Sequence, residues 1–473
     1  MSKNFFVELE DRAQRSKAAT LVASTAIKMS VAEFLDTSAR LASWIAEVHP
    51  EPNGVIALNV QPELEAMLVF ACYRQGLITC HYPVNKETLR SIGCTLIITS
   101  NHELDSGSIP KLNFNDAVLS KLASLDQVEP FMSEDPNRVV NLFFSSGTTG
   151  SPKVVPVTAA EMQTREAFVR SARIRGKYMS LLGLGTFGGF MTMFSQLMNL
   201  ETFFTPTTAE SNAKLISNWA IDTVFGSPQQ LSELADQIAK VAPNLQLREI
   251  QGTGLPVPRA LAARLISQTG SVITNAYAST EAGVVAMKTG SEDQTEYAGE
   301  ILDGVTLQVV DTQGFELPGG EVGIVRIKSP GQATQYWNNP EATREQFVDG
   351  WFYPGDLGSR ISNSLFLAGR NNDVLNAGGV KVDPTKLEDY LRSKEDIDDA
   401  AVFVFDAPGG VKSAAAAIVS SRPIDGESLR SELRGQFGEA SPSYFLRLGK
   451  IPRTELGKIA RSELSRILET RLQ

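Results

Sequence analysis

The sequence predicts an α/β protein with a large N-terminal domain of layered sheets and a small α+β C-terminal domain. Short apolar strands alternate with amphipathic helices up to about Gly299, which is typical of a layered core with a largely parallel sheet. Beyond that point short strands are joined by glycine-containing turns, which predicts a small antiparallel, barrel-like part. The last residues then read as a separate α+β unit.

The elements of the layered part follow from local patterns. Residues 31–48 repeat apolar side chains at spacings of three and four, which predicts an amphipathic helix. Residues 54–60 form a short apolar strand, and the helix after it is expected to end at Gly76. The alternation continues through expected strands at 95–100, 139–146, 178–184, 223–227, 247–253 and 271–278, with helices at 213–220 and 228–242.

The antiparallel part is expected at residues 305–329, where Gln313-Gly314 and Gly319-Gly320 indicate tight turns. We place the domain boundary at residues 369–373. The N-terminal domain is then residues 1–368 and the C-terminal domain residues 369–473, with a hinge near 370–373.

Composition narrows the function classes. The 473 residues are 42% hydrophobic and 21% charged, with a formal net charge of -10. Because no block of lysine and arginine exists, nucleic acid and anionic membranes lose their electrostatic attraction. No signal-like N-terminus and no run of about 18 apolar residues is found, so we expect a cytoplasmic protein without membrane insertion.

Cysteine and histidine are scarce. The cysteines stand singly among apolar neighbours, which favours reduced core thiols: Cys72, Cys80 and Cys94. The histidines all lie in the first quarter of the chain: His49, His81 and His102. This argues against a Ser-His hydrolase and a histidine-rich zinc site, so the chemistry is expected to use Lys, Glu, Asp, Arg and backbone dipoles.

A glycine- and hydroxyl-rich loop, SSGTTGSPK, follows an apolar strand at residues 145–153. Its glycines let the backbone approach an anion, its hydroxyls donate hydrogen bonds, and Lys153 adds a positive charge. An ordinary polar turn is the alternative for this loop taken alone. It is not a Walker A loop, since Pro152 stands where that motif needs glycine.

A second glycine motif, GxGxxG, occurs at residues 183–188, but it is weak evidence for a dinucleotide site. Such a site needs an acidic residue at the end of the next strand, whereas Glu201 stands before that strand.

Six segments in order resemble the motifs of the adenylate-forming superfamily: acyl- and aryl-CoA synthetases, luciferases and peptide-synthetase adenylation domains. Residues 145–155 resemble its phosphate loop, 251–258 (QGTGLPVP) its GGAPLP segment, and 275–283 (NAYASTEAG) its YGxTE motif. Residues 350–358 (GWFYPGDLG), 369–388 (GRNNDVLNAGGVKVDPTKLE) and 451–461 (IPRTELGKIAR) resemble the later motifs. The resemblance implies ATP, Mg²⁺ and coenzyme A as cofactors, and a mobile C-terminal domain.

The resemblance also implies roles for residues. Tyr277 would lie against the adenine, Asp356 would accept hydrogen bonds from the ribose, and Arg370 would support the nucleotide from the domain boundary. Glu281 would hold Mg²⁺, a cation that prefers carboxylate and phosphate oxygen. The full nucleotide-binding set is Ser145, Ser146, Gly147, Thr148, Thr149, Gly150, Lys153, Gly252, Thr253, Gly254, Asn275, Tyr277, Ala278, Ser279, Thr280, Asp356 and Arg370.

Lys458 and Glu281 are the catalytic residues that the resemblance implies. Lys458 would bridge the substrate carboxylate and the α-phosphate, where an ammonium stabilises the charge that gathers in the transition state. A thiol then attacks the acyl-adenylate after the C-terminal domain rotates. The thioester step and hinge would use Asn372, Gly378 and Gly379.

This sequence departs from the family pattern at three motif positions and, to the largest extent, in the acid pocket. Asn372 stands at the hinge in place of Asp or Lys, Pro354 replaces a threonine, and Ala278 replaces a glycine.

The acid pocket is expected at Gly185, Thr186, Phe187, Gly188, Ala278 and Val284. No acidic residue occurs from 181 to 193, which argues against an α-amino acid. GLGT at 183–186 is similar to GLGN of benzoate-type ligases and favours an aromatic or short, compact acid.

The sequence thus predicts a stand-alone ligase that joins a carboxylic acid to coenzyme A. Two alternatives stay open. One is an adenylation enzyme that loads a non-amino acid onto a separate acyl carrier protein. The other is a nucleotide-binding protein without catalysis.

Overall fold

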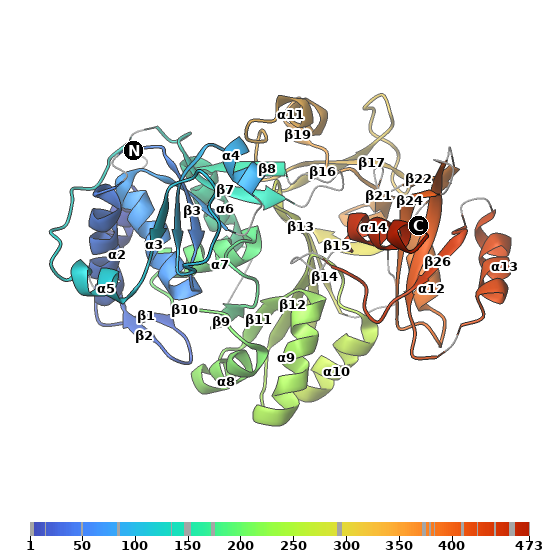
Figure 1. Ribbon diagram of the computed structural model, residues 1–473, viewed down its shortest axis with the longest axis horizontal. Helices are drawn as coiled ribbons and strands as arrows, with labels where there is room; N and C mark the ends of the chain where they lie inside the picture. Colours follow the sequence, from blue (N-terminus) through green and yellow to red (C-terminus); the bar gives the residue numbers. More distant parts are fainter. Residues whose placement is uncertain are drawn as a thin grey trace.

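The computed structural model describes most of the chain. The described residues are 4–14, 16–48, 51–82, 86–133, 135–145, 153–171, 176–290, 296–370, 375–377, 380–382, 384–407, 411–422, 424–438, 441–453 and 459–472. Figure 1 shows two sheets with helices packed on them, and a smaller unit at the C-terminal end.

The first sheet has the strand order β6-β5-β3-β4-β7-β8. Its strands are β3 (Val55–Asn59), β4 (Ile78–His81), β5 (Cys94–Thr99), β6 (Lys111–Asn113), β7 (Val139–Ser145) and β8 (Lys153–Thr158). All neighbours are parallel except β7 and β8, which form an antiparallel hairpin around residues 146–152. The parallel part confirms the prediction from the alternating pattern.

The second sheet has the strand order β18-β19-β17-β20-β21-β15-β14-β13-β12-β11-β9, with β16 paired to β17. Its parallel half is β9 (Tyr178–Ser180), β11 (Thr223–Gly226), β12 (Glu249–Thr253) and β13 (Val272–Ser279). The antiparallel half is β14 (Gly283–Thr289), β15 (Tyr297–Ile301), β16 (Thr306–Val310), β17 (Gly323–Lys328), β18 (Phe347–Val348), β19 (Trp351–Phe352), β20 (Asp356–Ile361) and β21 (Ser364–Arg370). The antiparallel part therefore continues directly from the parallel sheet.

The helices around the sheets begin and end at recognisable signals. Ser30 and Glu33 form a capping box at the start of α2 (Val31–Ala46), and Gly76, with φ 70°, ends α3 (Pro62–Gln75). The other helices of this part are α1 (Phe5–Ala13), α4 (Lys86–Ser91), α5 (Asp116–Leu122), α6 (Ala159–Ser171), α7 (Phe187–Met198), α8 (Ala209–Trp219), α9 (Pro228–Val241), α10 (Arg259–Thr269) and α11 (Pro340–Gln346). A small sheet joins β1 (Thr20–Ala23) to β2 (Lys28–Ser30) and β10 (Phe203–Phe204).

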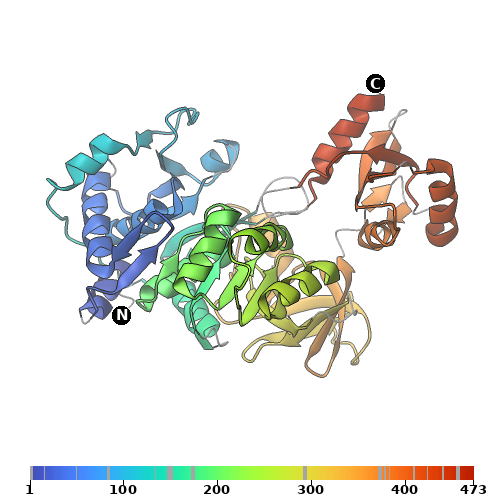
Figure 2. The ribbon, with the colours of Figure 1, turned by 90° about the horizontal axis from the view of Figure 1, so that it is seen from below.

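The C-terminal unit is built on β24 (Asp399–Ala407), β25 (Val411–Val419) and β26 (Tyr444–Arg447), and Figure 2 shows it to one side of the larger part. Side chains alternate along β24: Val402 packs into a core with α12 (Pro384–Arg392) and α13 (Gly426–Phe437), while Phe403 packs into one with α14 (Arg461–Leu472). The hairpin of β22 (Leu375–Ala377) and β23 (Val380–Val382) precedes this unit.

One buried carboxylate links the helices of the C-terminal unit. Glu388 of α12 accepts hydrogen bonds from Arg461 Nη2 at 2.6 Å and from the backbone N–H of Val402 at 2.8 Å. Arg461 Nε also donates to the Val402 carbonyl at 2.9 Å. The start of α14, three residues after Lys458 in the sequence, is therefore fixed to α12 and to β24.

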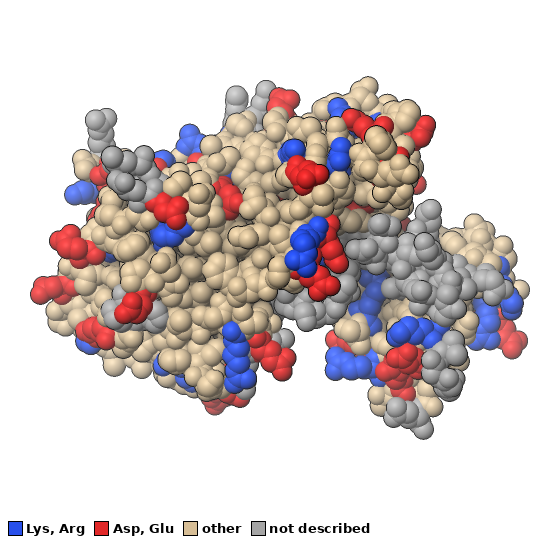
Figure 3. Space-filling view, turned by 90° about the horizontal axis from the view of Figure 1, so that it is seen from above, with Lys and Arg blue, Asp and Glu red and all other residues tan. Residues whose placement is uncertain are grey.

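Charged side chains of both signs are interspersed on the face shown in Figure 3. Among the described residues, every helix is too short or too polar to cross a bilayer.

Candidate active site

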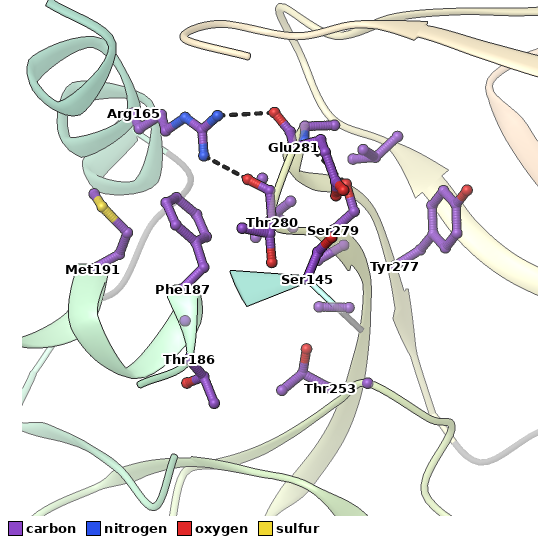
Figure 4. Close-up of a pocket in the computed structure, with 18 of the residues that line it drawn as sticks. Ser145, Arg165, Thr186, Phe187, Met191, Thr253, Tyr277, Ser279, Thr280 and Glu281 are labelled. Carbon is purple, nitrogen blue, oxygen red and sulfur yellow. Dashed lines mark hydrogen bonds between the residues drawn. The ribbon is translucent and has the colours of Figure 1, made fainter. Parts of the chain in front are cut away.

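A cavity of about 760 Å³ lies between α6, α7 and strands β11 to β13. Figure 4 shows Phe187 and Met191 of α7 on one side and Tyr277 of β13 on the other, with Thr280 and Glu281 between them. Many of the predicted site residues line it: Ser145, Lys153, Thr186, Phe187, Gly188, Thr253, Gly254, Tyr277, Ala278, Ser279, Thr280, Glu281, Val284 and Asp356. Motifs more than 200 positions apart in the sequence thus meet around one space.

The strand ends on either side of the predicted phosphate loop border this cavity. Ser145 ends β7 and pairs in register with Lys153, the first residue of β8, so the strands hold the two ends of the loop together. The Lys153 ammonium lies 5.1 Å from the centre of the Tyr336 ring, an arrangement in which the ring face attracts the cation. The positive charge expected near the phosphates is therefore held at the cavity wall.

Glu281 lies in the turn between β13 and β14 and is 7% exposed. The hydroxyl of Tyr336 donates a hydrogen bond to Glu281 Oε1 at 2.9 Å, and Gln346 is a second acceptor for the same hydroxyl. Burial raises the pKa of Tyr336, and the negative charge of Glu281 raises it further. The phenol therefore stays protonated and can donate a hydrogen bond. Tyr336 thus fixes the orientation of the carboxylate that is predicted to hold Mg²⁺.

We expect Tyr336→Phe to raise the Mg²⁺ concentration for half-maximal activity roughly tenfold, because partners that orient a metal ligand typically contribute this much to affinity. The measurement is acid-dependent ATP–pyrophosphate exchange at increasing Mg²⁺. Tyr297→Phe is the matched control, since it removes a hydroxyl that donates to the exposed Glu300 at 2.7 Å. An equal Mg²⁺ requirement in the two variants would contradict the orienting role.

Tyr277, which lies across the cavity from Phe187 (Figure 4), contacts Asp356. The Tyr277 hydroxyl donates to Asp356 Oδ2, and Asp356 is buried at the first position of β20. Asp356 pairs in register with Arg370, of which the structure describes the backbone. The predicted adenine and ribose contacts are therefore neighbours.

Two predicted nucleotide residues, Gly252 and Asn275, support the cavity and do not line it. Asn275 Oδ1 accepts a hydrogen bond from the backbone N–H of Val257 at 2.7 Å. A Cβ at Gly252 would lie 2.3 Å from the Val257 side chain, so only glycine allows this close approach. Both residues shape the turn that carries Thr253 and Gly254 to the cavity.

The acid end of the cavity is formed by the start of α7. Thr186 caps this helix by accepting a hydrogen bond from the Gly189 N–H at 3.1 Å, which places Phe187 and Gly188 at the wall. Gly185 does not line the cavity: a Cβ there would lie 2.5 Å from the ring of His81. Glu65 in turn contacts His81 Nδ1 at 2.7 Å. The glycine predicted for the pocket therefore makes room for a histidine behind it.

Several predicted residues lie outside the described part of the chain: Ser146, Gly147, Thr148, Thr149, Gly150, Asn372, Gly378, Gly379 and Lys458. Their roles, and the domain boundary at 369–373, stay predictions.

The lining residues that the sequence did not single out include Arg165, Met191 and Tyr336. Arg165 had a detectable signal, because it shares the buried face of α6 with Ala159 and Met162 at a spacing of three. An arginine on an apolar helix face needs polar partners, which marks it for attention.

Comparisons with known proteins show what this chain is similar to. A family model described as AMP-binding enzyme matches residues 9–337. The feruloyl-CoA synthase of an Amycolatopsis species is 26% identical over 458 residues, covering 89% of this chain and 90% of that protein. A medium/long-chain fatty acid–acyl-carrier-protein ligase of Mycobacterium tuberculosis is 26% identical over 354 residues, or 68% of this chain and 65% of that protein.

The fold has solved counterparts. The O-succinylbenzoate coenzyme A synthetase of Bacillus subtilis, in complex with AMP, superposes with a TM-score of 0.83 at 19% identity, covering 98% of both chains. At that identity the likeness concerns the fold, which confirms the large layered part and the smaller C-terminal unit. Since the family model covers well over half of the chain, the protein belongs to the AMP-binding enzyme family.

Proposed function

We propose that this protein activates a carboxylic acid with ATP and transfers the acyl group to the thiol of coenzyme A. The observation that carries the proposal is the shared cavity, which is lined both by the charged residues Lys153, Glu281 and Asp356 and by the apolar residues Phe187 and Met191. One end suits a charged nucleotide and the other an apolar acid. The feruloyl-CoA synthase relative supports coenzyme A as the acceptor.

The residues present fit Mg²⁺ with ATP. Within the described part of the chain, no lysine or arginine forms an ion pair with the Glu281 carboxylate, although the side chain is buried. A buried anion without such a partner favours a bound cation. When bound, Mg²⁺ would neutralise charge on the phosphates of ATP.

The residues of the chain would divide the work of the first half-reaction. Lys153 and the loop that it ends would hold the phosphates, and Tyr277 with Asp356 would fix the nucleoside. Attack of the acid carboxylate on the α-phosphorus forms the acyl-adenylate and releases pyrophosphate. Lys458 would stabilise the charge that develops in this step. The thiol of coenzyme A then displaces AMP, and the loss of the thiol proton completes the thioester.

The acid is expected to be aromatic or short and compact. Phe168, Phe187, Met191 and Phe225 supply aromatic and thioether surface to the cavity wall. Flat apolar rings pack well against such walls, because aromatic and sulphur–aromatic contacts add to the burial of apolar area. A panel of benzoates, cinnamates and short-chain acids in the exchange assay tests this expectation.

Met191→Ala should raise the KM for the best aromatic acid by about 10-fold or more, because one or two methylene contacts in an apolar pocket are worth that factor. The KM for ATP should stay unchanged. Met198→Ala is the matched control: both methionines lie on α7 and are 3% exposed, but Met198 does not line the cavity. If the two variants raise the acid KM equally, Met191 does not contact the acid.

The test of the proposed function is a thioester assay on the wild-type protein. We expect acid-dependent pyrophosphate exchange and the formation of a coenzyme A thioester with at least one acid of the panel. A thioester formed only on a phosphopantetheinylated carrier protein would favour the carrier-loading alternative, which the Mycobacterium ligase relative supports. The absence of exchange with every acid would contradict the proposal altogether.

A further inference from the structure

Arg165 of α6 is the largest fully buried side chain in the described part of the chain, with 2% exposure. Its guanidinium reaches the cavity on the side away from Tyr277 (Figure 4). Within the described part of the chain, it donates no hydrogen bond to another side chain. Instead, Nη1 donates to the carbonyl of Thr280 and Nη2 to the carbonyl of Glu281, each at 2.8 Å, and Nε donates to the carbonyl of Gly331.

The charge of Arg165 has an unusual setting. No ion pair of Arg165 occurs among the described residues; the face of the Phe187 ring lies 4.6 Å away, carbonyl oxygens accept its hydrogen bonds, and Glu161 and Glu281 act on its charge without forming an ion pair with it. Burial lowers the pKa of Arg165 to about 10, which leaves the side chain charged at neutral pH. Burying a cation without a hydrogen-bonded carboxylate is costly, so an arginine at this position calls for an explanation beyond packing.

The three carbonyls belong to two segments that form the metal end of the cavity. Thr280 and Glu281 are consecutive in the turn between β13 and β14. Gly331 lies in a second segment, which reaches back to that turn through a hydrogen bond from the Ala333 N–H to the Glu281 carbonyl at 2.8 Å. Gly331 has φ +70°, and a Cβ there would lie 2.7 Å from Arg165 Cγ. Both segments are thus drawn closely against α6.

We propose that Arg165 is a positioning residue for the adenylation step, which holds the backbone of Thr280 and Glu281 so that the Glu281 carboxylate meets the metal–nucleotide. The planar fork of the guanidinium suits this task, because its N–H groups point in fixed directions toward three acceptors. The Phe187 ring keeps the plane of the fork in place. The inference rests on the proposed function.

The test is Arg165→Lys in the full-length enzyme. Lysine keeps the charge but cannot reach three carbonyls that surround a planar group. We expect the Mg²⁺ concentration for half-maximal pyrophosphate exchange to rise by about 10–100-fold at fixed ATP, the usual effect of removing a partner that orients a metal ligand. This concentration does not depend on how much of the protein is folded, so it separates positioning from stability.

Arg170→Lys is the matched control, on the same helix but with a side chain that is 56% exposed. Arg165→Gln is the second variant, because it removes the buried charge and keeps an amide donor. An Mg²⁺ requirement within twofold of the wild type in either folded variant would overturn the proposal, and so would the failure of both variants to fold. Wild-type protein that shows no exchange would contradict the proposed function itself.

Discussion

Lys458→Ala is expected to lower acid-dependent ATP–pyrophosphate exchange by about 10²–10³-fold, the typical loss when one preorganised charge on a transition state is removed. Negative charge gathers on the phosphate oxygens as the acid attacks, and the ammonium is predicted to lie there in the first conformation of the C-terminal unit. Lys450→Ala is the control, because Lys450 is an exposed lysine of the same unit.

The same variant also separates the two half-reactions. A synthetic acyl-adenylate offered to Lys458→Ala with coenzyme A should form thioester at nearly the wild-type rate, since the charge that Lys458 stabilises arises only in the first step. Equal losses in both half-reactions would show that the lysine supports the fold or the thioester step. Unchanged exchange would exclude the assigned role.

Glu281→Gln is expected to lower maximal exchange on the order of 100-fold and to raise the Mg²⁺ requirement, because a neutral amide is a poor ligand for a hard cation. The substitution preserves volume, and the Tyr336 hydroxyl can still donate to the amide oxygen. The thermal midpoint should therefore change little. Exchange at increasing Mg²⁺, together with thermal unfolding, measures both effects.

Glu345→Gln provides the comparison for Glu281. This exposed glutamate also borders the cavity, so the variant removes the same charge from the same region. Losses of similar size in the two variants would indicate a general electrostatic effect, and Glu281 would lose its assignment as the metal ligand.

The elements that could be predicted from the sequence are those whose signals are local. The helix at 31–46 is indicated by its apolar periodicity and by Ser30 and Glu33 at its start. Gly76, which adopts a positive φ, ends the next helix. Gly314 and Gly320 likewise adopt positive φ in the predicted turns of the antiparallel part. Each of these features depends on residues that are close to one another in the sequence.

The pairing of strands with distant partners could not be predicted. The strand expected directly after Glu201 is present as β10, but its residues Phe203 and Phe204 pair with Val22 and Ala23, about 180 positions earlier. No local pattern shows which distant segment such a short strand will pair with.

The site shows the same division. Tyr277, Glu281 and Asp356 stand in short motifs that the family resemblance identifies. Arg165 and Tyr336 act through backbone carbonyls and a carboxylate supplied by other segments, and the sequence does not show which segments meet. Gly185 was predicted to line the acid pocket. In the structure, His81, about a hundred positions earlier in the sequence, packs where a side chain at position 185 would lie.

The C-terminal unit has two hydrophobic cores, one on each face of β24, and this affects how genes of such proteins can recombine. Both faces of β24 are covered by helices of the same unit, and Glu388 ties its first helix to its last. The described residues that line the acid cavity all lie between Phe144 and Asp356. A gene crossover at codons 371–374 would therefore exchange the Lys458-bearing unit whole, together with β22 and β23, with its packing intact. We expect the preferred acid to stay with the parent that contributes the first part of the gene, so that acid preference and the C-terminal unit would be inherited separately.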